Sequence, residues 1–328
     1  MDINRNAIIY NNINDKELSV QECLMEFAEV TIPEKIIVDR QEYIVTEIGA
    51  KAFQDCSILN KIILPDSIKK IGKGAFAKCT CLQMIHIPRS VQAIEDYAFF
   101  ECKNLENIYF DEPCKLLSIG FLTFYKCVSL KSIFLPSSIK KIRKKAFYQC
   151  DNLERVNLSS LSCLSEIEEE VFAGCRKLKP IEMPNSIKQI GSHAFSACFK
   201  YDSVLIPKNI ERIDVSAFFN TKIISIYVDS DNKFYDSRDN CNAIIETCSN
   251  KLILGCVNTV IPKSVRIVDI SAFANYELKQ IKIPETVEKI EMTFEGLGFL
   301  EKIFVPANKK AYFMSQLSSY FWDALDVY

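Results

Sequence analysis

Cysteine and histidine are the side chains of this sequence whose chemistry could make an enzyme, with 14 cysteines and 2 histidines present. A cysteine nucleophile needs a histidine as its base, and the two available bases are His86 and His193. His193 lies five residues before Cys198. A cysteine-dependent hydrolase built on this pair is a remote alternative, because it requires both side chains to face one site.

The sequence contains no complete set of ligands for a metal ion or a phosphate group. A zinc site needs Cys or His pairs at short spacing, and the pair Cys79 and Cys81 has no second pair to complete it. Neither of the glycine-rich phosphate-binding motifs, G-x-G-x-x-G and G-x-x-x-x-G-K-[ST], occurs. We therefore expect no cofactor, no metal and no catalytic activity.

The composition indicates a folded protein whose surface carries no large excess of either charge. The 328 residues are 48% hydrophobic and 25% charged, with a formal net charge of -2, so the clustered basic excess that nucleic-acid binding needs is missing. No apolar run approaches the roughly eighteen residues of a membrane span, and we expect no membrane insertion. Residues 1–6 lack the pattern of a signal peptide. The sequence is therefore compatible with a cytoplasmic protein and with a protein whose leader is missing.

An internal repeat predicts the structural elements that position the cysteines and histidines, and residues 71–91 are one copy of it. The template is I-x-x-x-A-F-x-x-C-x-x-L-x-x-I-x-I-P-x-S-I, and successive copies begin 23 or 25 residues apart, within the range of leucine-rich repeats. Clear copies begin at Ile48, Ile71, Ile94, Ile119, Ile142, Ile167, Ile190 and Ile213, and looser ones at Val268 and Ile290.

Each repeat position has a physical reason. The I-x-I triplet predicts a short strand with two side chains inward, which the following Pro ends because it lacks an N–H. The Ala-Phe pair and the repeated Cys should point inward as apolar groups, since one coil alone cannot cover its core. At about 4.8 Å per strand, some twelve coils would make a rod on the order of 55 Å long.

Three segments depart from the template. Residues 1–47 hold strand-like pieces at 7–10, 18–20 and 30–33 and are predicted to cap the first open edge, while residues 48–306 form the solenoid. Within it, about 229–258, two apolar runs around a polar turn predict a β-hairpin. Residues 307–328 change to helical spacing, and this predicted C-terminal helical cap should close the last coil with Tyr312, Leu317, Phe321 and Leu325.

The repeat unit resembles that of the BspA-like leucine-rich-repeat family, over roughly residues 40–306. The insertion D-N-C-N-A-I-I-E-T is also similar to a segment of many bacterial members. The resemblance implies a mainly β, right-handed solenoid with a stacked parallel sheet, acting as a surface or secreted antigen that adheres to host, matrix or other cell-surface proteins. The weak unit around Phe294 departs from the pattern, and the missing leader puts the surface location in doubt.

The central residue of each I-x-I triplet points away from the core and so marks a candidate protein-binding face. Seven of the eleven residues in this column are apolar or aromatic, and exposed apolar surface usually marks interaction sites. The alternative is that these residues reflect only the β-propensity of such side chains. We predict a binding strip, called the strip below, from Ile63, His86, Tyr109, Phe134, Leu205, Tyr227, Val260 and Phe304, with Asn157, Glu182 and Lys282 as the polar members of the column.

Two other features have structural explanations. The basic triplet 143–145 is followed one repeat later by the acidic triplet 168–170, so stacking should pair them rather than leave a polyanion site. Outside the inward column, Cys241, Cys248 and Cys256 are the better candidates for a disulfide bridge or a reactive thiol. The function expected is adhesion or protein binding by a monomer; an intracellular protein-interaction scaffold is the alternative.

Overall fold

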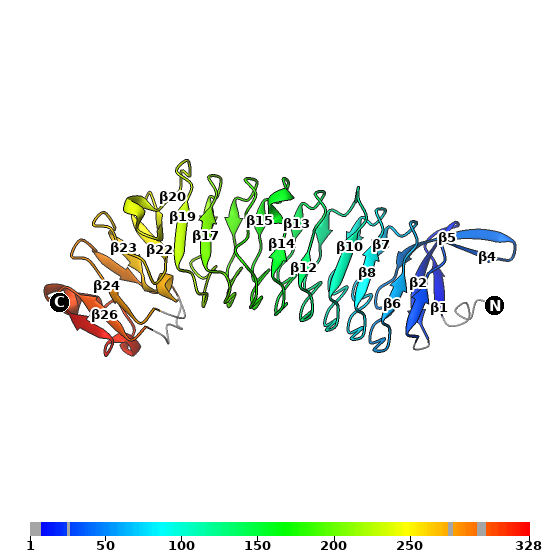
Figure 1. Ribbon diagram of the computed structural model, residues 1–328, viewed down its shortest axis with the longest axis horizontal. Helices are drawn as coiled ribbons and strands as arrows, with labels where there is room; N and C mark the ends of the chain where they lie inside the picture. Colours follow the sequence, from blue (N-terminus) through cyan, green and yellow to red (C-terminus); the bar gives the residue numbers. More distant parts are fainter. Residues whose placement is uncertain (1–7, 25–26, 275–277, 294–299) are drawn as a thin grey trace.

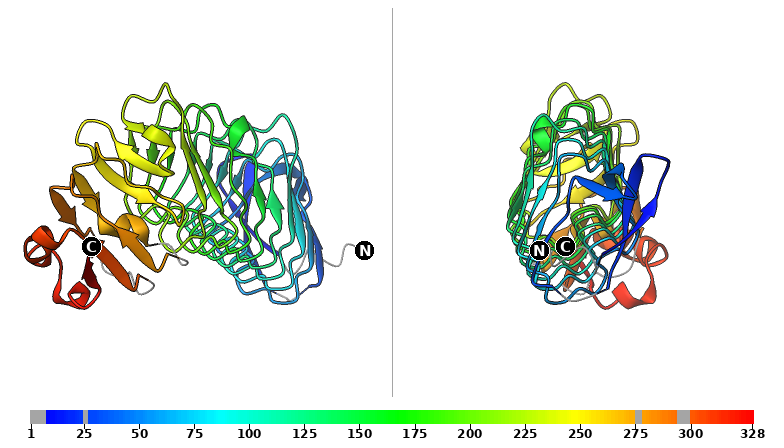
Figure 2. Two further views of the ribbon diagram at one scale, coloured as in Figure 1. Left: turned by 60° about the vertical axis from the view of Figure 1, so that its left-hand side comes forward. Right: turned by 90° about the vertical axis from the view of Figure 1, so that its right-hand side faces the viewer.

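The structure, a computed structural model, describes residues 8–24, 27–274, 278–293 and 300–328. The chain forms a mainly β solenoid of about 13 stacked turns, elongated along the stacking axis (Figure 1). Seen along that axis, the turns superpose (Figure 2). The expected repeat solenoid is therefore confirmed, while Ala7 and Phe294 lie outside the described residues.

The I-x-I triplets form a parallel ladder, called the first ladder. In β8 (Met84–Ile87), Ile85 and Ile87 are buried and His86 is exposed, as the alternation predicts. The other strands of this ladder are β3 (Glu29–Thr31), β6 (Lys61–Ile63), β10 (Asn107–Phe110), β12 (Ser132–Ile133), β14 (Arg155–Val156), β17 (Ser203–Ile206), β19 (Ser225–Val228), β24 (Gln280–Lys282) and β26 (Lys302–Val305).

A second parallel ladder, which we did not predict, runs through the first Ile of each repeat. It pairs Ile71 with Ile94, and Ile167 with Ile190. The sequence gives no sign of it, because two-residue strands leave no alternating pattern to recognise. Its strands are β5 (Gln41–Ile48), β7 (Lys70–Ile71), β9 (Ala93–Ile94), β11 (Ser118–Ile119), β13 (Lys141–Ile142), β15 (Glu166–Ile167), β16 (Gln189–Ile190) and β18 (Arg212–Ile213).

A column of buried phenylalanines fills the centre of the coils. Neighbouring rings stack with centroids 5.2–5.5 Å apart and planes within 6–15° of parallel. Identical side chains thus meet one another coil after coil, as the repeat predicts. The column consists of Phe53, Phe76, Phe99, Phe124, Phe147, Phe172, Phe195 and Phe218.

The repeated cysteines face inward and also serve as hydrogen-bond donors, a role that we did not predict. In six coils Sγ lies 3.0–3.2 Å from the carbonyl oxygen of the Phe in the preceding coil, for example Cys102 with Phe76. Burial raises the pKa of the Cys79 thiol to about 12. The thiol therefore suits this position as a small donor. Cys56 in the first coil is half-buried.

Two positions in each of the seven coils that begin at Ile48 to Ile190 adopt a positive φ, although most of their residues are not glycine. One follows the Phe by two residues, where Gly174 has a φ of 77° and Ala197, one coil later, has a φ of 56°. These turns let the Phe N–H donate to the next coil, as Phe172 does to the Ala194 carbonyl at 2.9 Å.

We expect Ala197→Gly to raise the free energy of unfolding by roughly 0.5–1 kcal/mol. Relief of the left-handed conformation contributes about 1–2 kcal/mol, and the greater freedom of glycine in the unfolded chain offsets about 0.5–1 kcal/mol of it. Urea unfolding measures the change. Ala194→Gly, at a buried position outside the positive-φ set, is the matched control and should be destabilising; equal losses in both variants would contradict the explanation.

The N-terminal strands extend the second ladder. β1 (Ile8–Asn12) pairs antiparallel with β2 (Glu17–Cys23), and β2 pairs in parallel with β5. An additional strand, β4 (Lys35–Val38), forms a hairpin with β5. The β cap is thus present, although we had not recognised its hairpin. The proposed boundaries at 47 and 306 stay predictions.

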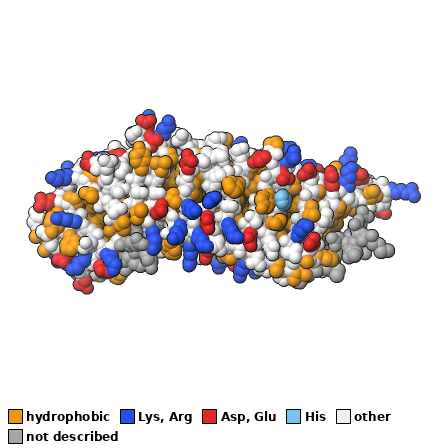
Figure 3. Space-filling view, viewed as in Figure 1, with side chains coloured by type: hydrophobic (Ala, Val, Ile, Leu, Met, Phe, Trp, Pro, Cys, Tyr) orange, Lys and Arg blue, Asp and Glu red, His pale blue; other side chains and the backbone are white. Residues whose placement is uncertain are grey.

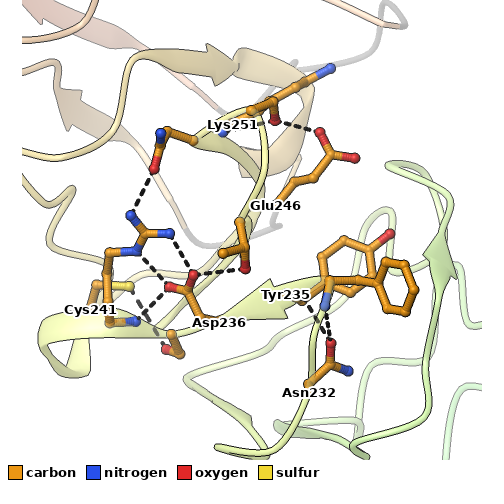
Figure 4. A network of polar contacts seen from close by, with 12 residues as sticks. Asn232, Tyr235, Asp236, Cys241, Glu246 and Lys251 are labelled. Atoms are coloured by element: carbon orange, nitrogen blue, oxygen red, sulfur yellow. Dashed lines mark hydrogen bonds and ion pairs between the residues drawn. The ribbon is translucent and has the colours of Figure 1, made fainter.

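The predicted hairpin insertion is present as β21 (Ala243–Glu246) and β22 (Lys251–Gly255), which pair antiparallel. β20 (Tyr235–Asp236) joins it on one side. On the other side, β22 continues the second ladder into β23 (Ile267–Asp269) and β25 (Lys289–Glu291). Polar contacts hold the hairpin (Figure 4): Asp236 accepts bonds from Arg238 Nε at 2.7 Å and Thr247 Oγ1 at 3.0 Å.

The hairpin separates two hydrophobic cores. The larger core runs from the first strand to the hairpin and includes Ile244 and Leu254. The smaller core begins at the hairpin with Ala243 and Ile245 and continues to Leu325. Because neighbouring residues of β21 belong to different cores, the insertion acts as a two-sided layer within the stack.

The C-terminal segment is only partly helical. Its one α-helix is α1 (Lys310–Met314), and β27 (Leu325–Val327) adds in parallel to β26. Leu317, Phe321 and Leu325 are buried as expected, whereas Tyr312 is exposed and Phe313 takes the buried place. The short 3-10 helices are Leu158–Ser160, Arg238–Asn240, Ile270–Phe273, Ala307–Lys309 and Ser319–Phe321.

Candidate protein-binding face

The strip residues lie on the outer side of the first ladder. Ile63, His86, Tyr109, Phe134, Leu205, Tyr227 and Val260 are exposed, and Phe304 is half-buried. Phe134 and Val260 are the most open, at 65% and 73% exposure. Hydrophobic side chains gather in several groups along the molecule, separated by charged ones (Figure 3).

Parallel register brings neighbouring strip residues together in pairs. The rings of His86 and Tyr109 stack with centroids 4.8 Å apart. Leu205 lies opposite Tyr227, and both line a groove of about 320 Å³ that Glu182 also borders. The polar member Asn157 instead turns back, donating to the Leu135 carbonyl and accepting from the Leu135 N–H. The strip is thus divided into segments.

Val260 does not lie on a strand beside Leu205 and Tyr227. Its segment, residues 257–262, has no strand structure, and its N–H donates to the Cys241 carbonyl at 3.0 Å. A pocket of about 610 Å³ opens beside it, toward β24. We had not predicted this pocket, because the insertion that redirects residues 257–262 has no counterpart in the other coils.

The second ladder offers an internal comparison for the composition of the strip. The outward residues of its strands β7 to β18 are Lys70, Ala93, Ser118, Lys141, Glu166, Gln189 and Arg212. None is aromatic or β-branched. Six of these seven outer residues are polar, Ala93 being the exception, and β-propensity alone therefore does not account for the apolar strip.

Charged residues on the other surfaces neutralise one another between coils. Lys144 pairs with Glu169 at 2.6 Å and Lys145 with Glu170 at 3.2 Å, as predicted. The third pair differs from the expectation, because Arg143 reaches back to Asp96 and Glu168 pairs with Lys141. The basic triplet is therefore engaged in ion pairs and is no open polyanion site.

The residues proposed for chemistry are not arranged for it. Cys198 is buried, burial raises the pKa of its thiol, and Sγ donates to the Phe172 carbonyl. His193 packs edge-on against Phe219 with ring centroids 5.7 Å apart. Within the described ranges, no cluster of three or more His, Cys, Asp or Glu side chains could hold a metal ion.

The three cysteines of the insertion are thiols. Cys241 and Cys256 are buried, and burial raises the pKa of each. Cys248 is exposed. The structure therefore contradicts a bridge between these cysteines. A reactive thiol stays a prediction, and Cys248 is the one of the three that solvent reaches.

Two stacked parallel ladders, an inward Leu-Ile-Phe core and a short repeat define the chain as a leucine-rich-repeat solenoid. The model of the BspA type leucine rich repeat region matches residues 22–121, 46–161, 117–244 and 248–320. These matches span most of the chain, which therefore belongs to this family, as the repeat motif predicts. No helix in the described part of the chain combines the length and apolarity needed to cross a bilayer.

Solved structures with the same architecture come from several bacteria. A leucine rich repeat protein of T. pallidum is 29% identical, with a TM-score of 0.54, over 60% of this chain and 89% of that one. A leucine rich cell surface protein of Faecalibacterium prausnitzii is 21% identical with a TM-score of 0.61, covering 98% and 92%. One from Bacteroides ovatus is 23% identical with a TM-score of 0.55 over both full chains. No curated protein sequence matches.

Proposed function

We propose that the chain is a non-catalytic protein-binding module whose strip binds a protein ligand. The observation that carries the proposal is the contrast between the two ladders: seven of the eleven outer residues are apolar or aromatic on the first, whereas six of the seven outer residues of β7 to β18 on the second are polar. Aromatic side chains supply much of the energy at protein interfaces, and the membership of a repeat family favours a partner of this kind.

Adhesion at a cell surface is the location and role that we propose, with a matrix or cell-surface protein as the ligand and a monomer as the binding unit. The family relationship supports this role. An intracellular interaction scaffold is the second candidate, favoured by unbridged cysteines such as Cys248, which are usual in reducing compartments. Labelling intact cells with a membrane-impermeant biotin reagent separates the two, since a scaffold would stay unlabelled.

The strip is tested by replacing Tyr109, Phe134 and Tyr227 together with alanine. We expect binding to weaken by about 100-fold or more, because each exposed aromatic is a candidate hot spot worth about 1–2 kcal/mol. Purified collagen, laminin and fibronectin are the probes, measured by biolayer interferometry on the whole chain.

The matched control replaces Lys70, Lys141 and Gln189 with alanine on the second ladder, where binding should not change. The melting temperature of both variants should stay within a few degrees of the parent, because exposed side chains contribute little to stability. Unchanged binding of the strip variant, or a large fall in its melting temperature with proportional loss of binding, would favour the packing role of these residues.

A further inference from the structure

The pocket beside Val260 lies at an interruption of the first ladder. Residues 257–261 form one wall, and β24 with the segment after it forms the other. Residues 257–261, which precede β24, bond to the insertion and not to β24. The Val260 N–H donates to the Cys241 carbonyl, and the Cys256 N–H donates to Thr259 Oγ1 at 2.7 Å. The insertion thus removes the strand that would otherwise lie beside β24.

Among the residues that the structure describes, β24 consequently has no strand partner on this edge. Its pairing with β26 runs through Ile281, which lies opposite Ile303, and Ile283 N–H donates to the Phe304 carbonyl at 2.8 Å. Successive amides of a strand point to opposite sides, so the N–H groups of Gln280 and Lys282 point toward the pocket. Among the described residues, no backbone hydrogen bond joins 257–261 to 278–283. Such an edge is a template for an added strand.

The pocket combines an apolar floor with a mainly basic rim. Ile261, Phe273 and Ile281 are buried residues that line it. Lys263 and Lys282 are exposed at its rim with one carboxylate, Glu285. The ammonium of Lys282 lies 3.7 Å from the ring centroid of Tyr328, whose hydroxyl donates to the Ile283 carbonyl at 3.0 Å. The C-terminal residue therefore holds this wall in place.

We propose that this site, the edge pocket, takes an extended acidic peptide segment of a partner protein, which adds to β24 as a strand. Its backbone carbonyls accept from Gln280 and Lys282 N–H, an apolar side chain enters the pocket, and a carboxylate faces Lys263 or Lys282. Backbone pairing supplies affinity and the side-chain pocket supplies selectivity in this mode of recognition. The inference deepens the proposed function and rests on it, because Val260 of the strip lines the edge pocket.

The test uses a phage library of random octapeptides panned against the whole chain, followed by synthetic copies of the enriched peptides. We expect sequences with alternating apolar residues and at least one Asp or Glu. Lys282→Pro removes one edge N–H without touching the bonds to β26 and should weaken binding by about tenfold or more. The matched control Lys282→Ala keeps the N–H but, like the proline variant, loses the exposed charge and its contact with the Tyr328 ring, so about a two- to threefold loss is expected.

Hydrogen exchange on the unmodified chain gives a second measurement that does not depend on folding of the proline variant. The Gln280 and Lys282 amides should exchange rapidly in the free chain and be protected about tenfold or more by a bound octapeptide. Enrichment of no peptide, equal binding to Lys282→Pro, or no change in these two amides would each overturn the edge pocket. The alanine variant of Tyr109, Phe134 and Tyr227 should still bind the octapeptides, so failure of the strip is distinguishable from failure of the edge pocket.

Discussion

Replacing Phe147 with alanine should lower the free energy of unfolding by about 3–5 kcal/mol. The side chain is fully buried and stacks between Phe124 and Phe172 at centroid distances of 5.3 and 5.5 Å. Its loss leaves a cavity and also removes two ring contacts worth about 0.5–1.5 kcal/mol each. The coils cannot collapse to fill the space, because hydrogen bonds between backbones hold their spacing on both ladders.

Urea unfolding followed by circular dichroism measures the change. Phe134→Ala is the matched control: this ring is 65% exposed on the strip, so its removal should change stability by no more than about 0.5 kcal/mol. Phe147→Leu should lie between the two, since it keeps an apolar side chain and loses the stacking. A loss below about 1 kcal/mol for Phe147→Ala would mean that the phenylalanine column does not hold the coils together.

Removing the Asp269 carboxylate should cost about 3–5 kcal/mol and unfold the C-terminal part of the solenoid first. This side chain has no exposed surface and lies 3.3 Å from the Lys251 ammonium. It also accepts from the backbone N–H groups of Ser271 and Thr293. Burial tends to lower the pKa of Lys251, but Glu291 and Asp269 together hold that pKa above its ordinary value. Asp269→Ala therefore removes the acceptor of two backbone donors, the buried Ser271 N–H and the Thr293 N–H, and weakens the pairing of a half-buried cation.

Hydrogen exchange locates the effect, because Asp269 lies in the smaller of the two cores. Amides of residues 261–274 and 278–293 should lose protection while those of 53–218 keep it. The double variant Asp269→Ala with Lys251→Met should be less unstable than the sum of the single variants. Additive losses, or uniform loss of protection along the chain, would contradict the coupling and the division into two cores.

The repeat made much of this architecture predictable. Ile85, Ile87 and Phe76 could be assigned to the core because each coil places the same residue type at the same point, and stacking turns that identity into contact. The outward position of His86 and Tyr109 followed from strand alternation. The pairing of Lys144 with Glu169 followed from the position of both residues one repeat apart.

Features that depend on unique contacts could not be read in this way. From β7 to β18 the second ladder consists of two-residue strands, which are too short for any periodic signal, and their partners lie 23 or 25 residues away. The thiol of Cys102 bonds to the carbonyl of another coil, and a backbone carbonyl carries no sequence signal. The ring of Phe273 lies where a methyl group on Gly255 would stand, a contact between the insertion and its neighbour.

The coil, its inward side chains and the column that faces solvent thus follow from the sequence, because these properties repeat. The departures from regularity arise from tertiary contacts alone: the hairpin with a core on each face, the open edge of β24 and the pocket that Tyr328 lines. These arise where a single insertion meets the regular coils, and the hydrogen bonds that Val260 and Cys256 form there have no equivalent elsewhere in the repeat.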